Sequence, residues 1–331
     1  MAGPRRDTRG IVDAAELFTH VRFRRYEPAG PLRPYVDNYW LIDWDLTEPY
    51  ASHIVPHPSV NLVFQRFSEG TPDFPGVVRA AVGFGEVAGV ALGLFTQKLE
   101  GRGRVCGVKF RPGGFRPFAP ERPVSEWTGR RVLVGEVFSG CLRGGLAGAS
   151  GENSGGDPGY DSGGYDSGGD DGGGGDDSGH ECGGGSEGDD PTGARAAALV
   201  LDPEDDLARV AALDAFLLTR GPRPDPRADL AVELAERIRT DGTALRVGEL
   251  SRGAGLSVRS LQRLFAAYVG VGPKWVVLRH RIHQALEHAE SAAEVDWPTL
   301  AADLGYADQA HLVRDFTATV GVPPTAYVPK R

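Results

Sequence analysis

The last hundred residues or so contain one helical pattern twice, and this repeat limits the possible folds more than any other feature of the sequence. Each copy predicts a short helix, a glycine and a second helix, and Ser257 and Asp308 begin the second helices 51 residues apart. Glycine tolerates the positive φ of a tight turn, and Ser and Asp are preferred at helix N-caps. This layout is typical of a helix-turn-helix. A single copy is a weak signal because many helical proteins contain such a turn. Two copies joined by one helix, predicted at 273–289, are a stronger one.

The second helix of each copy has an apolar face and a polar face. In the first copy, the apolar residues follow the i, i+3, i+4, i+7 spacing of a helix that packs one face inward. These residues are Leu261, Leu264, Phe265 and Tyr268. The opposite face carries Arg259, Gln262 and Arg263. In the second copy, Leu312 and Phe316 are expected to face inward, so the polar residues of that helix face outward.

Residues 145–193 separate this helical region from the first half of the chain. Twenty of these 49 residues are glycine, and the segment holds 12 Asp and Glu but no Lys or Arg. Such a composition cannot bury enough apolar surface to offset the entropy lost on ordering. We therefore predict a disordered Gly/Asp/Ser linker, and its aspartates form no calcium-loop pattern. The net charge of the chain is −9, and without these twelve carboxylates it is +3, so the acidic balance belongs to the linker.

The region before the linker predicts a small β-rich domain. Short runs of β-branched and aromatic residues are separated by Pro and Gly, as in a small antiparallel sheet or barrel. The predicted strands are 38–45, 60–67, 92–99 and 104–110. A helix is expected at 14–21 and another within 125–139, after the sheet.

The predicted fold class is α+β, with a barrel-like β-rich N-terminal domain and an all-α C-terminal domain. The predicted parts are a leader at 1–22, a β-rich sensor-like domain at 23–144, the linker at 145–193, a helical connector at 194–225 and a domain with two helix-turn-helix units at 226–331. In the connector, a helix is expected from Asp202 or Pro203 to Leu218.

Residues 243–331 resemble the DNA-binding domain of the AraC/XylS family of bacterial transcriptional regulators. The stretches that carry the resemblance are GLSVRSLQRLFAAYVGVGP, RIHQAL and LAADLGYADQAHLVRDFTATVGVPPTAY, and the last is especially close to the family signature. The resemblance covers about a quarter of the chain. Upstream, PLRPYVDNYWLIDW, IVPHPSVNLVF and GVKFRPGGFRPF are similar to the β-rich sensor-like domain often attached to such regulators, in a shorter and less specific match.

The resemblance implies that two recognition helices enter successive major-groove segments on one face of DNA. Carried over by position, the candidate DNA-binding residues are Ser257, Arg259, Gln262, Arg263, Gln309, Ala310, His311 and Arg314. Arg matches the O6/N7 edge of guanine, and Gln matches the N6/N7 edge of adenine. Ala310 departs from the pattern, since alanine offers only apolar contact, such as with a thymine methyl group. Asp308 would repel phosphate, so we expect it to cap its helix instead.

Catalytic and cofactor motifs are absent from the sequence. We find no nucleophile elbow, P-loop, HExxH or dinucleotide fingerprint, so we expect no enzyme activity, no catalytic residues and no cofactor. His53 and His57 lack an evident third ligand, so no metal site is expected. The alternative is an enzyme or repair protein with an appended helix-turn-helix, for example an alkyl acceptor that uses Cys106. This cysteine lies in an apolar strand, which favours a buried small hydrophobe.

The resemblance implies promoter DNA as the main partner and favours activation, with repression as the open alternative. RNA polymerase, a small-molecule effector at the N-terminal domain and a second copy in a homodimer are further candidate partners. A second alternative to the regulator is a module that sequesters a small molecule and has lost its DNA contacts. A measurement of salt-dependent DNA binding would distinguish the two. No run of 18 apolar residues and no signal peptide is found, and three cysteines without a CxxC pair fit a reducing compartment. We therefore expect a cytoplasmic protein without a membrane partner.

Overall fold

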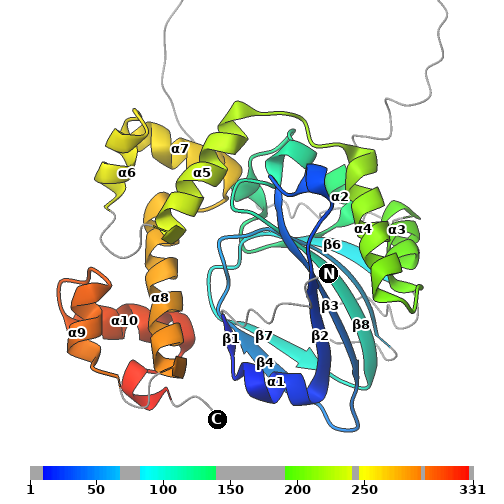
Figure 1. Cartoon of the computed structure of the whole chain (residues 1–331), viewed down its shortest axis with the longest axis horizontal. Coiled ribbons are helices and arrows are strands. Elements are labelled where there is room, and N and C mark those ends of the chain that lie inside the picture. The colour runs from blue at the N-terminus through cyan, green and yellow to red at the C-terminus, as the bar shows by residue number, and fades with distance from the viewer. Residues whose placement is uncertain (1–9, 68–82, 139–190, 241–245, 292–294, 328–331) are drawn as a thin grey trace, which may run out of the picture. The chain divides into compact units, whose positions relative to one another are not determined.

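A computed structural model describes residues 10–67, 83–138, 191–240, 246–291 and 295–327. Within these residues, the N-terminal part is β-rich and the C-terminal part is helical (Figure 1), which confirms the predicted fold class. The predicted linker lies almost wholly outside the described residues, as do Cys141 and Cys182. Among the described helices, none is both long enough and apolar enough to cross a membrane.

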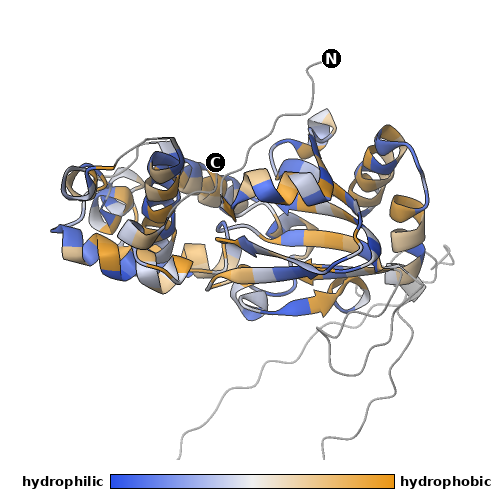
Figure 2. Cartoon of the chain, turned by 90° about the horizontal axis from the view of Figure 1, so that it is seen from below, coloured by the Kyte–Doolittle hydropathy of each residue, from blue (hydrophilic) through white to orange (hydrophobic). Residues whose placement is uncertain are grey.

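The larger sheet of the described chain has six antiparallel strands in the order β2, β3, β8, β5, β6, β9. In that order they span Val21–Tyr26, Val36–Asp45, Arg102–Phe110, Asn61–Phe67, Phe84–Ala88 and Arg131–Leu133. Buried and more exposed residues alternate along much of β3. In contrast, most of β5 is buried, with Phe64 in the apolar cluster on one face of the sheet and Val63 in the cluster on the other. β5 is thus a central strand covered on both faces, and Figure 2 shows mixed polar and apolar bands along the strands.

The smaller sheet of the described chain has three strands in the order β1, β4, β7, at Ile11–Val12, Tyr50–Ile54 and Phe95–Leu99. Helix α1, Ala14–His20, lies between β1 and β2 in the chain. One apolar cluster joins this sheet, α1 and one face of the larger sheet. Its buried members are Ile11, Leu17, Val21, Trp44, Val63, Phe67, Leu99 and Val105.

The four predicted strands correspond to β3, β5, β7 and β8, and the helix predicted at 14–21 corresponds to α1. The helix expected within 125–139 is present, but it is shorter than that segment. The structure has a 3-10 helix, η3, at Val124–Trp127, then β9, then the short helix α2 at Val134–Phe138. The middle of the segment pairs with β6, where Val132 lies opposite Val87, so tertiary pairing overrides the local helical preference.

Helices α3, Pro191–Leu201, and α4, Asp206–Arg220, lie beside the larger sheet (Figure 1), and α3 contacts β5, β6 and β8. The Asp205 side chain caps α4 by accepting a hydrogen bond from the Ala208 amide at 2.9 Å. The helix therefore begins three to four residues later than predicted, because residues 202–205 form a turn between the two helices.

Two carboxylates, Asp43 on β3 and Asp206 on α4, join α4 to the sheet. The buried Arg24 on β2 donates from Nη2 to both carboxylates at 2.5 Å and from Nε to Asp206 at 2.8 Å. Arg209, whose side chain is 1% exposed, donates from Nη1 to Asp43 at 3.1 and 3.2 Å. Burial raises the pKa of Asp206, but hydrogen bonds from Arg24 and Tyr26 outweigh burial and lower it to about 2. The Asp206 carboxylate therefore stays ionised except in strong acid.

We predict that Asp206→Ala lowers the free energy of unfolding by about 3–5 kcal/mol, because it leaves the buried Arg24 guanidinium without its main partner. Urea denaturation at pH 7 measures this change. The control is Asp202→Ala, which removes an ion pair with Arg66 at a carboxylate that is 61% exposed and should cost at most about 1 kcal/mol. The Asp206 contribution is present above the unfolded pKa and is lost as pH falls through the folded pKa. Equal small losses for the two variants would contradict the prediction.

The C-terminal region is a series of helices of which α8 is the longest described. They are α5 Pro226–Thr240, α6 Val247–Gly253, α7 Val258–Tyr268, α8 Pro273–Ser291, α9 Trp297–Asp303 and α10 Gln309–Val320. α8 matches the single helix predicted between the two helix-turn-helix units. The largest apolar cluster contains residues of β3, β5 and β8 together with residues of α3 to α8, so sheet and helices share one core.

His283 on α8 is 4% exposed and lies against the segment that follows β4. Its ring stacks on that of His57 with centroids 4.1 Å apart and planes 2° from parallel, and its Nε2 lies 3.3 Å from the Pro56 carbonyl oxygen. Burial and the nearby charge of His280 lower the pKa of His283 to about 3, against the weaker opposing effect of the Pro56 hydrogen bond. His283 is therefore neutral in the folded protein at neutral pH.

We predict that this histidine makes the fold sensitive to acid. The unfolded state binds a proton below about pH 6.5 whereas the folded state does not until about pH 3, so stability falls by about 1.4 kcal/mol per pH unit below roughly pH 6. His283→Gln removes this pH dependence, and urea denaturation between pH 7.5 and 5 measures it. The control His288→Gln changes an exposed histidine of the same helix. The same pH slope in wild type and His283→Gln would sink the prediction.

Candidate DNA-binding interface

The first helix-turn-helix unit consists of α6, a glycine turn and α7. Gly255 has φ +65°, a conformation that residues with a side chain rarely adopt. Leu256 after it is half-buried and packs against the large apolar cluster, so it fills the corner of the turn. The Ser257 hydroxyl then accepts a hydrogen bond from the Ser260 amide at 3.1 Å and caps α7.

The second unit repeats this arrangement with α9 and α10. Gly305 has φ +71°, and Tyr306 is buried beside it. The Asp308 carboxylate accepts a hydrogen bond from the His311 amide at 2.7 Å and caps α10, which is the role predicted for it. Both turns therefore obey the same local rules, although their sequences differ.

Helix α7 exposes the polar face that the sequence predicted. Arg259, Gln262 and Arg263 are all exposed, and Ser257 is exposed at the N-terminal end of the helix. The apolar side chains on the other face are buried: Leu261, Leu264, Phe265 and Tyr268. The structure thus brings the four predicted residues of this unit to the surface of one helix.

Helix α10 exposes three of its four candidate residues. Ala310, His311 and Arg314 are exposed, whereas Gln309 is half-buried at the first position of the helix. The Arg314 Nε donates to the Ala310 carbonyl oxygen at 3.3 Å, so its side chain lies along the helix surface. On the inner face, Leu312 and Phe316 are fully buried.

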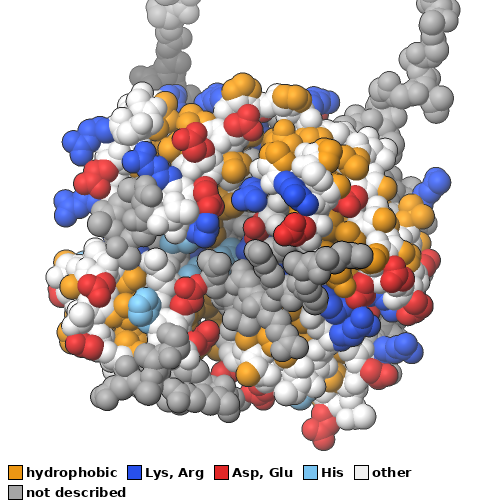
Figure 3. Space-filling view, in the orientation of Figure 1, with side chains coloured by type: hydrophobic (Ala, Val, Ile, Leu, Met, Phe, Trp, Pro, Cys, Tyr) orange, Lys and Arg blue, Asp and Glu red, His pale blue; other side chains and the backbone are white. Residues whose placement is uncertain are grey.

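Three exposed basic residues near the first unit were not singled out from the sequence. Arg246 occupies the N-cap position of α6, Arg252 lies near the end of that helix, and Lys274 is the second residue of α8. They stand alone in the chain and form no basic run, so only their placement beside α7 in the fold indicates a phosphate-binding role. Figure 3 shows Lys and Arg side chains around the α6–α7 end of this face, interspersed with Asp and Glu.

The C-terminal end of α7 is fastened to the β-rich part of the chain. Arg116 Nη1 donates to the Ala267 carbonyl oxygen at 3.0 Å, and Thr128 Oγ1 donates to the Gly270 carbonyl oxygen at 2.7 Å. Gly270 has φ +95°, and a Cβ there would lie 2.8 Å from Thr128 Oγ1 and 3.0 Å from Val124. α7 is thus fixed by its inner face and its C-terminal end, which leaves the polar face open.

The structure argues against the alkyl-acceptor alternative. The Cys106 side chain is fully buried in β8, and burial raises the pKa of its thiol to about 12. A protonated, inaccessible thiol is a poor nucleophile, so the prediction of a buried small hydrophobe is confirmed. Over the part of the chain that is described, no group of three or more His, Cys, Asp or Glu residues is placed to hold a metal ion.

Two family models match separate parts of the chain. Residues 250–330 match a model described as a helix-turn-helix domain, and residues 24–133 match a model described as a domain of unknown function. Residues 250–330 form an AraC-type helix-turn-helix domain. The chain is a DNA-binding transcriptional regulator that carries this domain after a β-rich N-terminal region.

Solved structures give weaker similarities. The DNA-binding domain of AdpA, a global transcriptional factor in complex with a target DNA, is 24% identical over 31% of this chain and 90% of that chain, with a TM-score of 0.27. ToxT from Vibrio cholerae is 9% identical over 87% of this chain and 96% of that chain, with a TM-score of 0.37. These values are too low to support an argument about fold or function. Among curated proteins, none matches the chain.

We predict that Asp308→Ala lowers the free energy of unfolding by about 1 kcal/mol, because the His311 amide at the start of α10 loses its acceptor. Asp308→Asn keeps a side-chain oxygen at the same place and should stay within a few tenths of a kcal/mol of wild type. Urea denaturation of the two variants measures the difference. If both variants lost the same stability, the capping role would be disproved.

Proposed function

We propose that this chain is an effector-responsive, sequence-specific regulator of transcription that reads two successive major-groove segments with α7 and α10. The observation that carries the proposal is the exposed polar face on the second helix of each unit. In both units this helix follows a glycine turn and has a capped N-terminus. Recognition helices of helix-turn-helix proteins read base edges with such a face. Two units on one chain provide two readers without a second copy of the chain.

The exposed residue types favour particular bases. Arg259 and Arg263 on α7 suit the O6/N7 edge of guanine, and Gln262 suits the N6/N7 edge of adenine. On α10, His311 and Arg314 are the exposed polar groups, and Ala310 is limited to apolar contact. We therefore assign most of the base reading to α7, and to α10 a weaker contribution.

Charge placement supports the same division of roles. Residues 226–331 hold 13 Lys and Arg against 12 Asp and Glu, so their net charge is only +1. Affinity for the phosphate backbone must come from a few well-placed groups, and Ser257, Arg252 and Lys274 are exposed around α7. The two recognition faces are expected about 34 Å apart, the spacing of one duplex turn.

The remaining assignments complete the proposal. Residues 23–144 act as the sensor domain, 194–225 connect it to the DNA-binding region, and 226–331 bind promoter DNA in the cytoplasm. The protein has no catalytic activity and activates transcription by contacting RNA polymerase, with a homodimer as a further level of organisation. The hydrogen bonds between Arg116 and Thr128 on one side and the end of α7 on the other provide the path from sensor to reader.

We predict that Arg263→Ala weakens binding to the cognate site by about 1–3 kcal/mol, which is roughly 5- to 150-fold in Kd. The cognate site is first selected from random duplexes with the full-length protein, and calorimetry or fluorescence anisotropy at fixed salt then gives Kd. Arg33→Ala is the matched control, since this exposed arginine is the C-cap residue of the 3-10 helix η1, Gly30–Leu32, far from α7 in the sequence. Scrambled DNA should bind both variants like wild type. Unchanged affinity of Arg263→Ala for the cognate site would remove it from the interface.

A further inference from the structure

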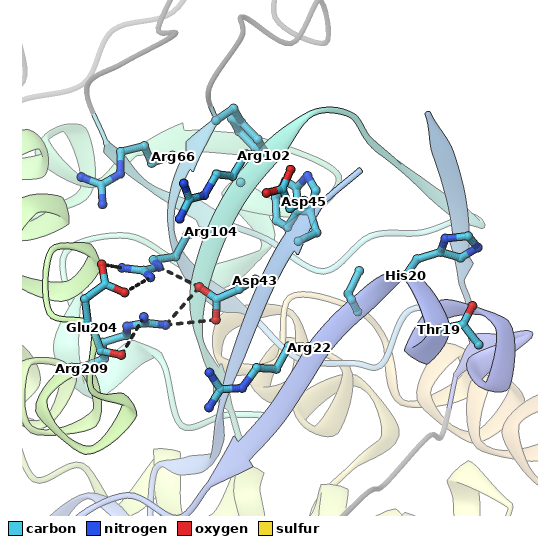
Figure 4. A pocket seen from close by; sticks show the side chains of 14 residues that line it. Thr19, His20, Arg22, Asp43, Asp45, Arg66, Arg102, Arg104, Glu204 and Arg209 are labelled. Carbon is cyan, nitrogen blue, oxygen red and sulfur yellow. Dashed lines mark hydrogen bonds and ion pairs between the residues drawn. The ribbon is translucent and has the colours of Figure 1, made fainter. Parts of the chain in front are cut away.

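A cavity of about 710 Å³ lies where strands β2, β3, β5 and β8 meet the end of α1 and the turn between α3 and α4. Figure 4 shows Arg66, Arg104 and Arg209 at one side of the cavity, Arg22 near its middle, and Thr19 and His20 of α1 at the opposite side. The lining residues belong to neither α7 nor α10. The cavity is therefore separate from the proposed DNA-binding face.

The lining of this cavity carries more positive than negative charge. Its arginines are Arg22, Arg66, Arg102, Arg104 and Arg209, and its acids are Asp43, Asp45 and Glu204. Asp43 is already engaged, because Arg24, Arg104 and Arg209 all donate hydrogen bonds to it. Its charge is thus neutralised from within the protein. Arg22 and Arg66 also pair with Asp206 and Asp202, which lie just outside the lining, so the attraction for an anionic ligand comes from the N–H donors that these two arginines have left rather than from net charge.

Arg22 keeps donor capacity for such a ligand. Its side chain is 69% exposed, and among the described residues its hydrogen bond is the one from Nη2 to Asp206 at 3.0 Å. Arg66 is also partly exposed and bonds Asp202 and the Leu201 carbonyl oxygen. A guanidinium group offers five N–H donors in a planar fork that matches a carboxylate or a phosphate.

Trp44 and Phe67 give the cavity an apolar wall. Their ring centroids lie 5.6 Å apart, and both side chains are nearly buried. Gly103 lies flat on Trp44, since a Cβ there would be 2.1 Å from the indole ring. The indole N–H donates to the Glu100 carbonyl oxygen at 3.1 Å, so Trp44 lines the cavity as an apolar side chain without a free donor.

We propose that the cavity binds a small organic anion, whose carboxylate or phosphate group pairs with Arg22 and its neighbouring arginines while an aryl or short alkyl body packs on Trp44 and Phe67. Arg104 links this site to the connector. Its Nη2 donates to the Glu204 carboxylate at 2.9 Å and its Nη1 to the Leu201 carbonyl oxygen at 2.7 Å. An incoming anion competes with Glu204 for Arg104 and loosens the α3–α4 turn from the sheet. This regulatory consequence rests on the proposed function, whereas ligand binding does not.

The test uses the full-length protein with phenylacetate and phenyl phosphate as probes and 2-phenylethanol as the uncharged control. Thermal shift and titration calorimetry should show saturable binding of the two anions and weaker binding of the alcohol. Arg22→Gln should weaken anion binding about ten-fold through the loss of a charge-assisted hydrogen bond. Arg122→Gln is the matched control, because this arginine is also 69% exposed but lies outside the cavity.

Glu204→Gln distinguishes ligand binding from a merely structural role, because it removes the competing carboxylate and should strengthen anion binding. If the substitutions acted only by destabilising the fold, both Arg22→Gln and Glu204→Gln would weaken anion binding. Failure of both anions to bind wild type, equal binding by Arg22→Gln and wild type, or weaker binding by Glu204→Gln would each overturn the proposal. DNA binding is measured separately with the same protein preparation. If the protein selects no DNA site, the proposed function is refuted, whereas the proposal for the cavity is still decided by the anion-binding measurements.

Discussion

The structure depends on one apolar core that the six-stranded sheet shares with the helices that follow the linker. Side chains of β3, β5 and β8, such as Leu41, Phe64 and Val108, belong to the same buried cluster as Leu213 on α4 and Phe265 on α7. The sensor-like region and the first helix-turn-helix unit therefore stabilise each other. Because α7 uses its apolar face for this core, its polar face is the one that remains exposed to solvent.

The two helix-turn-helix units could be predicted from sequence because the forces that form them are local. A glycine with positive φ, an N-cap three residues before the amide that it binds, and an apolar stripe all lie within about 25 residues. Strand β2 could not be predicted in the same way, since VRFRRY contains three arginines and reads as a polar segment. The burial of Arg24 in this strand is explained by its ion pair with Asp206, which lies 182 residues further along the chain.

The same distinction separates the two candidate sites. Arg259, Gln262 and Arg263 are predictable because the helical period alone places them on one face. The residues of the cavity come from positions 19 to 209. No spacing in the sequence connects Arg22 on β2 with Arg104 on β8 or Glu204 before α4. Only the register of the strands and the position of the α3–α4 turn bring these charges together.

The junction at Gly270 also bears on how new regulators of this kind can arise. Glycine is favoured there because its φ is +95° and because a Cβ would lie within 3.0 Å of Thr128 and Val124 of the β-rich region. A C-terminal half transplanted onto a different sensor would meet a surface that had not adapted to it. We expect the two halves to be inherited as a matched pair, and new operators to be acquired by changes on the solvent-facing side of α7 rather than by shuffling of whole domains.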